Sequence, residues 1–287
     1  MIKKIDGKKI AERVKDGIAQ EIFSFNGLRP NLAIILVGER PDSKLYVSLK
    51  EREAKKVGID ANVYRLDEDV PESEILEVVS FLNKDETIHG ILIQLPLPEK
   101  FNTDKIIEAL DPEKDVDGFH PAHPAYILSP VLAAIKACLE EIKFKAEGKS
   151  ACVLYNSEIF GNSVKDVLKE IGIKKVTKKS EEADLLITAL GKPHFIKKEM
   201  IKEGAVIIDI GITQVGEAVQ GDVDFEDVKN KGAYITPVPG GIGPQTIAFL
   251  FKNVLTIFKK GKKNPVDHKH HFHDECDCGE EYVECDE

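Results

Sequence analysis

The stretch Asn31–Gly38 reads NLAIILVG, a short and continuous apolar run. Such a run is typical of a strand that is buried on both faces of a parallel sheet. Before it, apolar residues recur every four positions over residues 7–25, which predicts an amphipathic helix. After it, Asp42 and Ser43 can cap a second helix that Gly58 closes. The order of helix, strand and helix predicts an α/β fold.

The same alternation continues along the first 140 residues. Strands are expected near Asn62–Leu66 and Gly90–Leu95, and helices over Pro71–Leu82 and near Thr103–Leu110. Strands that alternate with helices of this length form right-handed βαβ units around an open, mostly parallel sheet. The loop Asp111–Tyr126, which is rich in proline, then interrupts the alternation.

A second alternation follows a helix expected over Pro130–Ile142. Its expected strands and helices are Ala151–Tyr155, Ser163–Ile171, Ala183–Leu190, Ala205–Ile210, Ala233–Thr236 and Pro244–Lys259. This pattern predicts a Rossmann-type domain over residues 141–243. The first domain, a three-layer α/β unit with a mostly parallel sheet, is expected over residues 1–140, and the last helix, 244–260, is expected to pack back on it.

Length and composition predict a two-domain, water-soluble protein. The chain has 287 residues, of which 42% are hydrophobic and 31% are charged, and a domain usually spans about 100–200 residues. No apolar run reaches the roughly 18 residues that a membrane span needs, and the first residues are charged, unlike a secretory signal. We therefore expect a cytoplasmic protein with no membrane partner.

The net charge of −10 is concentrated at the C-terminal end. Residues 264–287 hold nine acidic residues and one lysine, so the rest of the chain carries a net charge of only −2. A nearly neutral body offers no basic surface for nucleic acid. Only Cys138 and Cys152 lie in the body, so the cysteines are not the disulfide framework of a secreted fold.

Residues that directly follow the expected strands are the first candidates for a functional site, because ligands of open α/β sheets bind beyond the carboxyl ends of the strands. Gln94 supplies an amide there, and the loop with Asp115 and Asp117 places two carboxylates beside Gly118. The segment Pro239–Gly243 reads PGGIG, and its glycines let a ligand approach the backbone closely.

Tyr46 and Lys50 lie four residues apart and therefore share one face of their expected helix. A lysine that is partly desolvated in a cleft can act as an acid or base near neutral pH, and a tyrosine ring can stack on a planar ligand. The alternative is a solvated lysine beside a tyrosine at the edge of the core. Spacing alone favours this alternative, because such pairs are common on amphipathic helices.

Five long motifs follow one another along the chain. They are SKLYVSLK (Ser43–Lys50), GILIQLPLP (Gly90–Pro98), DPEKDVDGFHPA (Asp111–Ala122), GDVDF (Gly221–Phe225) and TPVPGGIGPQT (Thr236–Thr246). In sequence and in order they closely resemble the FolD family, the methylenetetrahydrofolate dehydrogenase/methenyltetrahydrofolate cyclohydrolases. The resemblance extends from the N-terminus to about Lys260 and is far more specific than a single glycine-rich loop.

The resemblance implies oxidation of 5,10-methylenetetrahydrofolate to 5,10-methenyltetrahydrofolate and hydrolysis to 10-formyltetrahydrofolate, in a cleft between the two domains. It implies that Lys50 is the acid/base for the attacking water and that Gln94 orients it. Tyr46 would stack on the folate, Asp117 would accept hydrogen bonds from the pterin, and Asp115 would cap its loop. The implied folate-binding residues are Tyr46, Val47, Lys50, Ile93, Gln94, Leu95, Asp117, Pro239, Gly240, Gly241, Ile242 and Gly243.

The dinucleotide half departs from the family pattern. The resemblance places NADP or NAD along Tyr155, Asn156, Ser157, Gly161 and Ile212. Tyr155 stands where a glycine is usual, and a phenol ring there tends to occupy dinucleotide space. Asn156 replaces an arginine that clamps the 2′-phosphate of NADP. The segment Lys174–Asp184 is shorter than its family equivalent, and Lys178 and Lys179 are candidates for a substitute charge.

Three interpretations remain open. The protein is a bifunctional enzyme with an altered dinucleotide site for NADP or NAD, or a cyclohydrolase that has lost dehydrogenation, or a non-catalytic sensor that binds folate. A Rossmann dehydrogenase for another substrate is disfavoured, because the folate motifs match better than the nucleotide motifs. The retained amine beside an amide favours catalysis, since a scaffold has no need of that pair. The resemblance also implies a homodimer.

The C-terminal segment, residues 264–287, combines acidic residues with candidate metal ligands. These are His268, His270, His271, His273, Cys276, Cys278 and Cys285. Histidine and cysteine in this density can bind Zn²⁺ or another thiophilic metal. The spacing is not that of a known zinc finger, so a disordered acidic tail is the alternative.

Overall fold

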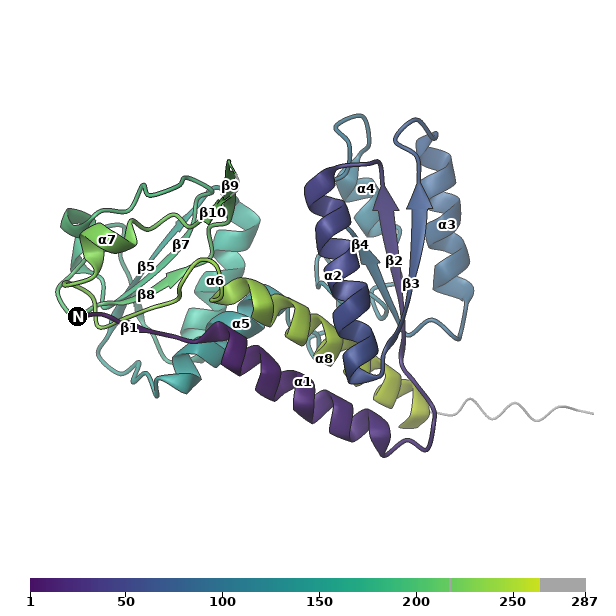
Figure 1. The fold of residues 1–287 in the computed structure, drawn as a ribbon, viewed down its shortest axis with the longest axis horizontal. Coiled ribbons are helices and arrows are strands. Elements are labelled where there is room, and N and C mark those ends of the chain that lie inside the picture. Colours follow the sequence, from purple (N-terminus) through teal and green to yellow (C-terminus); the bar gives the residue numbers. More distant parts are fainter. Residues whose placement is uncertain (217, 264–287) are drawn as a thin grey trace, which may run out of the picture.

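Two sheets stand side by side in Figure 1 and are connected by long helices. The structure is a computed structural model, and it describes residues 1–216 and 218–263. The smaller sheet has the strand order β3-β2-β4, and all its pairings are parallel. Its strands are β2 (Asn31–Val37), β3 (Asp60–Leu66) and β4 (Gly90–Ile93).

The central strand β2 separates two apolar cores, because its side chains alternate between the faces of the sheet. Even-numbered side chains from Leu32 to Leu36 pack with α1, α2 and α8, and odd-numbered ones from Ala33 to Val37 pack with α3 and α4. These helices are α1 (Gly7–Phe23), α2 (Pro41–Val57), α3 (Glu72–Lys84), α4 (Thr103–Glu108) and α8 (Ile242–Lys263). The expected three-layer α/β arrangement is confirmed.

The larger sheet has six strands in the order β1-β11-β8-β7-β5-β6, again with parallel pairings throughout. They are β1 (Lys3–Lys4), β5 (Ser150–Tyr155), β6 (Lys175–Val176), β7 (Leu185–Ala189), β8 (Val206–Asp209) and β11 (Tyr234–Ile235). The chain leaves β5 toward β6 on one side and continues with β7 on the other. This reversal beside β5 is the topological switch point of a Rossmann-type sheet.

Helices cover the larger sheet on one face, where α5 (Pro130–Glu141) and α6 (Glu158–Glu170) pack on alternate side chains of its strands. The opposite face packs against α7 (Phe225–Val228) and the segment around Ile196 and Ile201. The helix α8 lies against α1 and α5 and reaches the smaller sheet, where Phe251 is fully buried. The last helix therefore packs back on the first sheet, as expected.

Some element bounds differ from those expected from the sequence. The helix α6 begins at Glu158, before the expected start at Ser163, because the Ser157 hydroxyl caps it by accepting from the Phe160 N–H. Serine is a common capping residue, so Ser163 gave a false start signal. The helix α8 begins at Ile242 instead of Pro244.

Three short pieces of strand structure were not expected. They are β1, β6 and the antiparallel hairpin of β9 (Thr213–Val215) and β10 (Ala218–Gln220). Each is two or three residues long, and none contains the continuous apolar run that marks a buried strand. As a result, the first residues of the chain belong to the larger sheet. The division of the chain at residues 140 and 243 stays a prediction.

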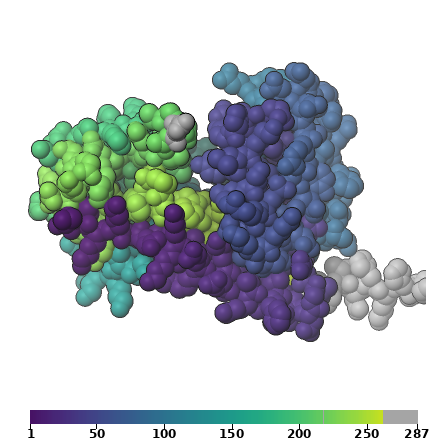
Figure 2. Space-filling model, viewed as in Figure 1, coloured from purple at the N-terminus to yellow at the C-terminus, as the bar shows by residue number. Residues whose placement is uncertain are grey.

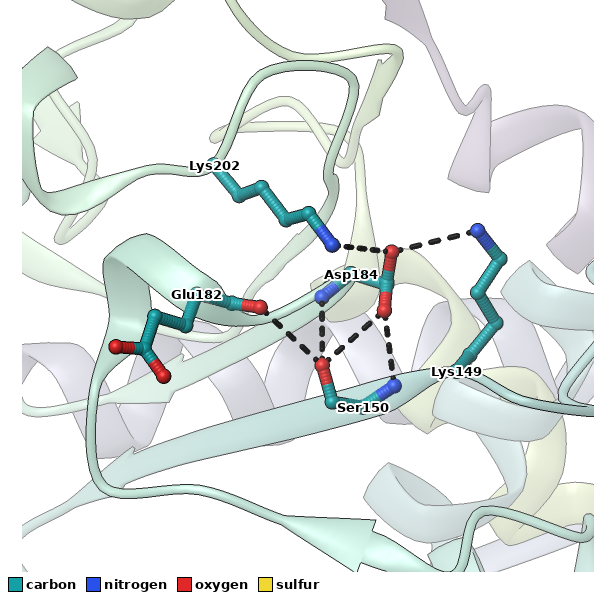
Figure 3. A network of polar contacts seen from close by, with 5 residues as sticks. All are labelled: Lys149, Ser150, Glu182, Asp184 and Lys202. Carbon is teal, nitrogen blue, oxygen red and sulfur yellow. Dashed lines mark hydrogen bonds and ion pairs between the residues drawn. The ribbon is translucent and has the colours of Figure 1, made fainter.

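Asp184 holds the amino end of the larger sheet together (Figure 3). One carboxylate oxygen accepts from the Ser150 N–H at 3.0 Å, and the other accepts from Lys202 at 2.9 Å and from Lys149 at 3.3 Å. Burial alone would raise the pKa of Asp184, but the hydrogen bonds to it outweigh burial and lower the pKa. The network fixes the start of β7 beside the start of β5.

Within the described ranges, no helix is long and apolar enough to cross a membrane. The same residues contain no cluster of three or more histidine, cysteine or acidic side chains that could hold a metal ion. The candidate ligands from His268 to Cys285 lie outside the described residues, so the zinc site stays a prediction.

Candidate active site

A cavity of about 580 Å³ lies between the two halves of the molecule. Its walls are the first turns of α1, one face of α2, the residues after β4 and β8, and the segment that leads into α8. Figure 2 shows the surface hollowed between these halves. The cavity lies beyond the carboxyl ends of parallel strands, where ligands of such sheets bind.

The helix α2 places Tyr46, Leu49 and Lys50 along the cavity. Residues three and four apart share a helix face, so the spacing noted in the sequence brings the phenol and the amine to the same wall. Pro41 at the start of the helix and Gly58 in the left-handed conformation at its end fix its length. The alternative of a fully solvated lysine is wrong, because Lys50 is half-buried.

Lys50 is hydrogen-bonded to Gln94, which directly follows β4. The Lys50 Nζ donates to Gln94 Oε1 at 2.9 Å, and Gln94 Nε2 donates to the Leu95 carbonyl at 2.7 Å. The second bond fixes the amide so that its oxygen faces the amine. The side chain of Lys50 is therefore held in one position at the cavity wall.

Burial changes the charge state of this wall. Desolvation lowers the pKa of Lys50, and the nearby Asp117 carboxylate partly offsets this by raising it. Burial also raises the pKa of Asp117 to about 6, although Lys50 acts in the opposite direction and Asp115 adds to the rise. Lys50 and Asp117 are thus an interacting pair whose pKa values are both moved toward neutrality, which suits proton transfer near pH 7.

Asp115 shapes the loop that carries Asp117. One of its oxygens accepts from the N–H groups of Asp117 and Gly118 at 3.0 and 3.1 Å, and the other accepts from the His120 N–H at 2.7 Å. Asp115 is 2% exposed, so its carboxylate closes the turn and does not face the cavity. The same loop is held to α8, because Asn253 Nδ2 donates to the Val116 carbonyl at 2.8 Å.

The segment Pro239–Gly243 lines the cavity opposite α2. It also lies directly against the start of α1, where a Cβ on Gly7 would fall 1.8 Å from the Gly241 carbonyl oxygen. Gly7 is therefore required for this close approach. Gly240 has a positive φ of 104°, a conformation that glycine adopts without strain.

Most residues expected along the folate line the cavity, but three do not. Val47 and Ile93 are buried in the two cores that flank β2, so their side chains point away from the cavity. The expectation for these two side chains is therefore wrong. Val47 follows Tyr46 and Ile93 precedes Gln94, and neighbouring side chains on a helix or strand point in different directions. Asp117 is not among the lining residues, but it is half-buried and its carboxylate is close enough to Lys50 to raise the pKa of that amine, so it adjoins the cavity at Lys50.

The sequence did not reveal that α1 forms part of the cavity. Lys8, Glu12 and Lys15 line it from the polar face of this helix. Lys15 also donates to Glu53, whose pKa burial alone would raise but which Lys15 and Lys56 hold at about 2. Their spacing places them on one helix face, but the same spacing is found on any helix face that meets solvent, so it could not indicate a cavity.

Ile212 lines the cavity from the larger sheet, whereas the other expected dinucleotide residues lie at the β5–α6 turn. The ring of Tyr155 is folded back onto Gly161, where a Cβ would fall 2.5 Å from ring atoms. The ring therefore lies along α6, and whether it occupies dinucleotide space stays a prediction. Ser157 caps α6, and Gly191 has a positive φ of 66° in the turn after β7. Both turns lie at the carboxyl edge of the larger sheet, beside the switch point.

A parallel α/β sheet and a Rossmann-type sheet that share a cleft with a desolvated lysine define a two-domain enzyme with a dinucleotide-binding half. The sequence matches two family profiles, the catalytic domain of tetrahydrofolate dehydrogenase/cyclohydrolase over residues 5–117 and its NAD(P)-binding domain over residues 130–262. The chain belongs to the tetrahydrofolate dehydrogenase/cyclohydrolase family.

Individual relatives agree with this assignment over almost the whole chain. A bifunctional protein FolD from a Sulfurihydrogenibium species is 43% identical over 277 residues, which cover 89% of this chain and 97% of the relative. The crystal structure of the bifunctional enzyme FolD from Campylobacter jejuni is 35% identical, with a TM-score of 0.85 over 91% of this chain and 99% of that one. The Trypanosoma brucei FolD, solved with NADP and an inhibitor, is 30% identical, with a TM-score of 0.86 and the same coverage.

The protein is therefore an enzyme of one-carbon folate metabolism with dehydrogenase and cyclohydrolase activities and an NAD(P)-binding domain. The similarity does not favour the interpretations in which dehydrogenation is lost or the protein only senses folate.

Proposed function

We propose that one cavity carries out both reactions, with Lys50 as the acid/base. In the first, 5,10-methylenetetrahydrofolate gives a hydride to NAD(P)⁺ and becomes the 5,10-methenyl cation. In the second, water adds to the methenyl carbon, one carbon–nitrogen bond of the bridge opens, and 10-formyltetrahydrofolate and a proton are released. The observation that supports this proposal is the hydrogen bond between the desolvated amine of Lys50 and Gln94 at the cavity wall.

Hydrolysis needs a group that accepts a proton from the attacking water and returns one to the departing nitrogen. Lys50 is suited to both steps, because burial lowers the pKa of its ammonium and makes the neutral amine accessible. Gln94 Oε1 accepts a hydrogen bond from the Lys50 amine, so the nitrogen lone pair of the neutral amine points away from Gln94. In this proposal it is directed at the water.

Substrate orientation falls to the residues around the amine. Tyr46, which is 38% exposed, offers its ring as a stacking surface for the aromatic part of the folate. The carboxylate of Asp117 accepts hydrogen bonds from the N–H groups of the pterin edge. The backbone of Pro239–Gly243 lies close to the transferred carbon, and the lack of side chains at its glycines permits the approach.

The dehydrogenase half requires the carbon bridge to face the nicotinamide ring. NAD(P)⁺, when bound, supplies the hydride acceptor. Ile212 and the segment before α8 form the cavity wall on the side of the larger sheet, and there they exclude water from one face of the substrate. No acid is needed, because the product cation is stabilised by both neighbouring nitrogens.

We further infer a cytoplasmic homodimer, with the folate domain over residues 1–140 and the Rossmann domain over 141–243. Cys138 and Cys152 are both free and buried, which is compatible with a reducing compartment. The dimer follows from the family resemblance alone. Sedimentation velocity distinguishes a monomer from a dimer of the 31.9 kDa chain.

A spectrophotometric assay tests the proposed function. Purified protein is given 5,10-methenyltetrahydrofolate, and in parallel 5,10-methylenetetrahydrofolate with NAD⁺ or NADP⁺. The expected result is turnover of both substrates. Hydrolysis without reduction of either nucleotide would refute the dehydrogenase half, and absence of both activities would refute the proposal as a whole.

A further inference from the structure

The strand β6 stops well below the carboxyl edge of the larger sheet. Lys175 and Val176 pair with Ser150 and Ala151, whereas β5 continues to Tyr155 beside β7. At about 3.3 Å per residue, the last four residues of β5 extend about 13 Å beyond β6. In a Rossmann-type sheet the end of the second strand is where the 2′ position of the adenosine ribose is recognised. Here this strand does not reach that level.

After β6 the chain crosses the amino end of β5 to reach β7, which starts at Leu185. Asp184, just before β7, accepts from the N–H of Ser150 at the very start of β5 (Figure 3). The crossing segment includes Lys178 and Lys179, and Lys179 is paired with Glu182 at 2.7 Å. These lysines therefore lie on the amino side of the sheet. Our proposal therefore gives neither lysine a part in binding the dinucleotide.

The side chain of Tyr155 lies against α6, on the face of the larger sheet that α5 and α6 cover. Its ring packs on Gly161, and its hydroxyl donates to Glu158 at 3.2 Å and accepts from Lys165 Nζ at 3.0 Å. The amine of Lys165 also lies 5.0 Å from the ring centre. Glu158 and Lys165 are the charged residues in the first eight positions of α6, and the tyrosine joins them into a cluster with no net charge.

The residue after Tyr155 is also neutral and is already engaged. Asn156 Nδ2 donates to the Leu190 carbonyl at 3.2 Å, which ties the turn after β5 to the turn after β7 across the switch point. A 2′-phosphate carries up to two negative charges and is bound by cationic donors, above all by arginine. A 2′-hydroxyl needs a neutral or acidic acceptor only.

We propose that this chain binds NAD⁺ in preference to NADP⁺, with Tyr155 and Asn156 as the residues that determine this specificity. The short β6 removes the usual place for a phosphate-binding side chain, Tyr155 binds the nearest lysine, and Asn156 presents an amide. The inference rests on the proposed function, which requires the dinucleotide at this sheet.

Equilibrium binding tests the inference independently of turnover. Isothermal titration calorimetry compares NAD⁺ with NADP⁺, and 5′-ADP with 2′,5′-ADP, on the wild-type protein. We expect NAD⁺ to bind at least about tenfold more tightly than NADP⁺, because a 2′-phosphate without a cationic partner loses hydration on binding and gains no hydrogen bond in return. Asn156→Arg should tighten the binding of 2′,5′-ADP about tenfold, and Gln20→Arg, which adds the same charge at an exposed site on α1, should leave it unchanged.

The outcomes separate this inference from the proposed function. If NADP⁺ binds as tightly as NAD⁺, or more tightly, the inference is overturned while the dehydrogenase stands. The same holds if Asn156→Arg and Gln20→Arg affect 2′,5′-ADP equally. If the protein hydrolyses the methenyl substrate but binds neither dinucleotide, both the inference and the dehydrogenase half of the proposed function are overturned.

Discussion

Replacing Lys50 by methionine removes the amine from the cavity wall and keeps a side chain of similar length. We expect Lys50→Met to lower the rate of hydrolysis of 5,10-methenyltetrahydrofolate by a factor of roughly 10²–10⁴, the range for loss of a general acid or base. This corresponds to about 3–5 kcal/mol of transition-state stabilisation. The fold should survive, because Lys50 takes no part in the apolar core beside α2 and the variant removes only its hydrogen bond to Gln94.

The same variant should change how folate binding depends on pH. The positive charge of Lys50 lowers the pKa of Asp117, which nevertheless stands at about 6 because of burial. Below that pH the carboxylate is protonated and loses its capacity to accept from the pterin, so affinity should fall up to about tenfold per pH unit. Without Lys50 the pKa of Asp117 rises, so the midpoint of this loss should move to higher pH.

The measurements are a stopped-flow assay of hydrolysis and calorimetric titration with 5-formyltetrahydrofolate between pH 5 and 8. Lys44→Met is the matched control, since Lys44 is an exposed residue of α2 that pairs with Glu39. It should alter neither quantity. Hydrolysis by Lys50→Met at the wild-type rate would refute the role of Lys50. A shift of the binding midpoint to lower pH would refute the coupling to Asp117.

Three further changes probe the framework. Glu53→Gln should lower the free energy of unfolding by about 2 kcal/mol at pH 7, which is less than the full pKa difference implies because solvent in the cavity partly screens the carboxylate. In the wild type this contribution is present above pH 4.5 and is lost as the pH falls toward 2. Measuring the free energy of unfolding across this pH range checks it. Asp184→Asn should cost about 1–2 kcal/mol in urea unfolding, and the exposed Asp166→Asn less than about 0.5 kcal/mol; equal effects would contradict the network of Figure 3. Gly161→Ala should lower the melting temperature, because its Cβ would meet the ring of Tyr155, and Tyr155→Ala should restore it.

The fold was predictable where burial of an element produces a recognisable pattern of apolar residues. The strand β2 is buried from Leu32 to Val37, so its apolar run is continuous and its helices follow at the usual spacing. The strand β1 is two lysines long and is held by its backbone pairing with β11. Backbone pairing leaves no mark on side-chain periodicity, so no sequence pattern could have predicted this strand.

The active site was predictable for residues that directly follow strands or belong to a recognisable motif. Lys50 and Gln94 are 44 positions apart in the sequence, and only the family resemblance predicted that they share one site. The contribution of α1 to the cavity was not predictable, because Lys8 and Glu12 form an ordinary polar helix face. Whether such a face meets solvent or a cavity depends on tertiary packing, here of α1 against α8.

The departures from the family pattern in the dinucleotide half are physically connected. The short β6 pairs with β5 only as far as Ala151, and the ring of Tyr155 at the end of β5 can pack on α6 only because Gly161 has no side chain. The phenol then binds Lys165 and Glu158. Each departure taken alone predicts a damaged site, yet Tyr155, Glu158 and Lys165 together form a hydrogen-bonded cluster with no net charge. The sequence therefore indicates a changed dinucleotide site, and the contacts of Tyr155 are the basis for the proposed preference for NAD⁺.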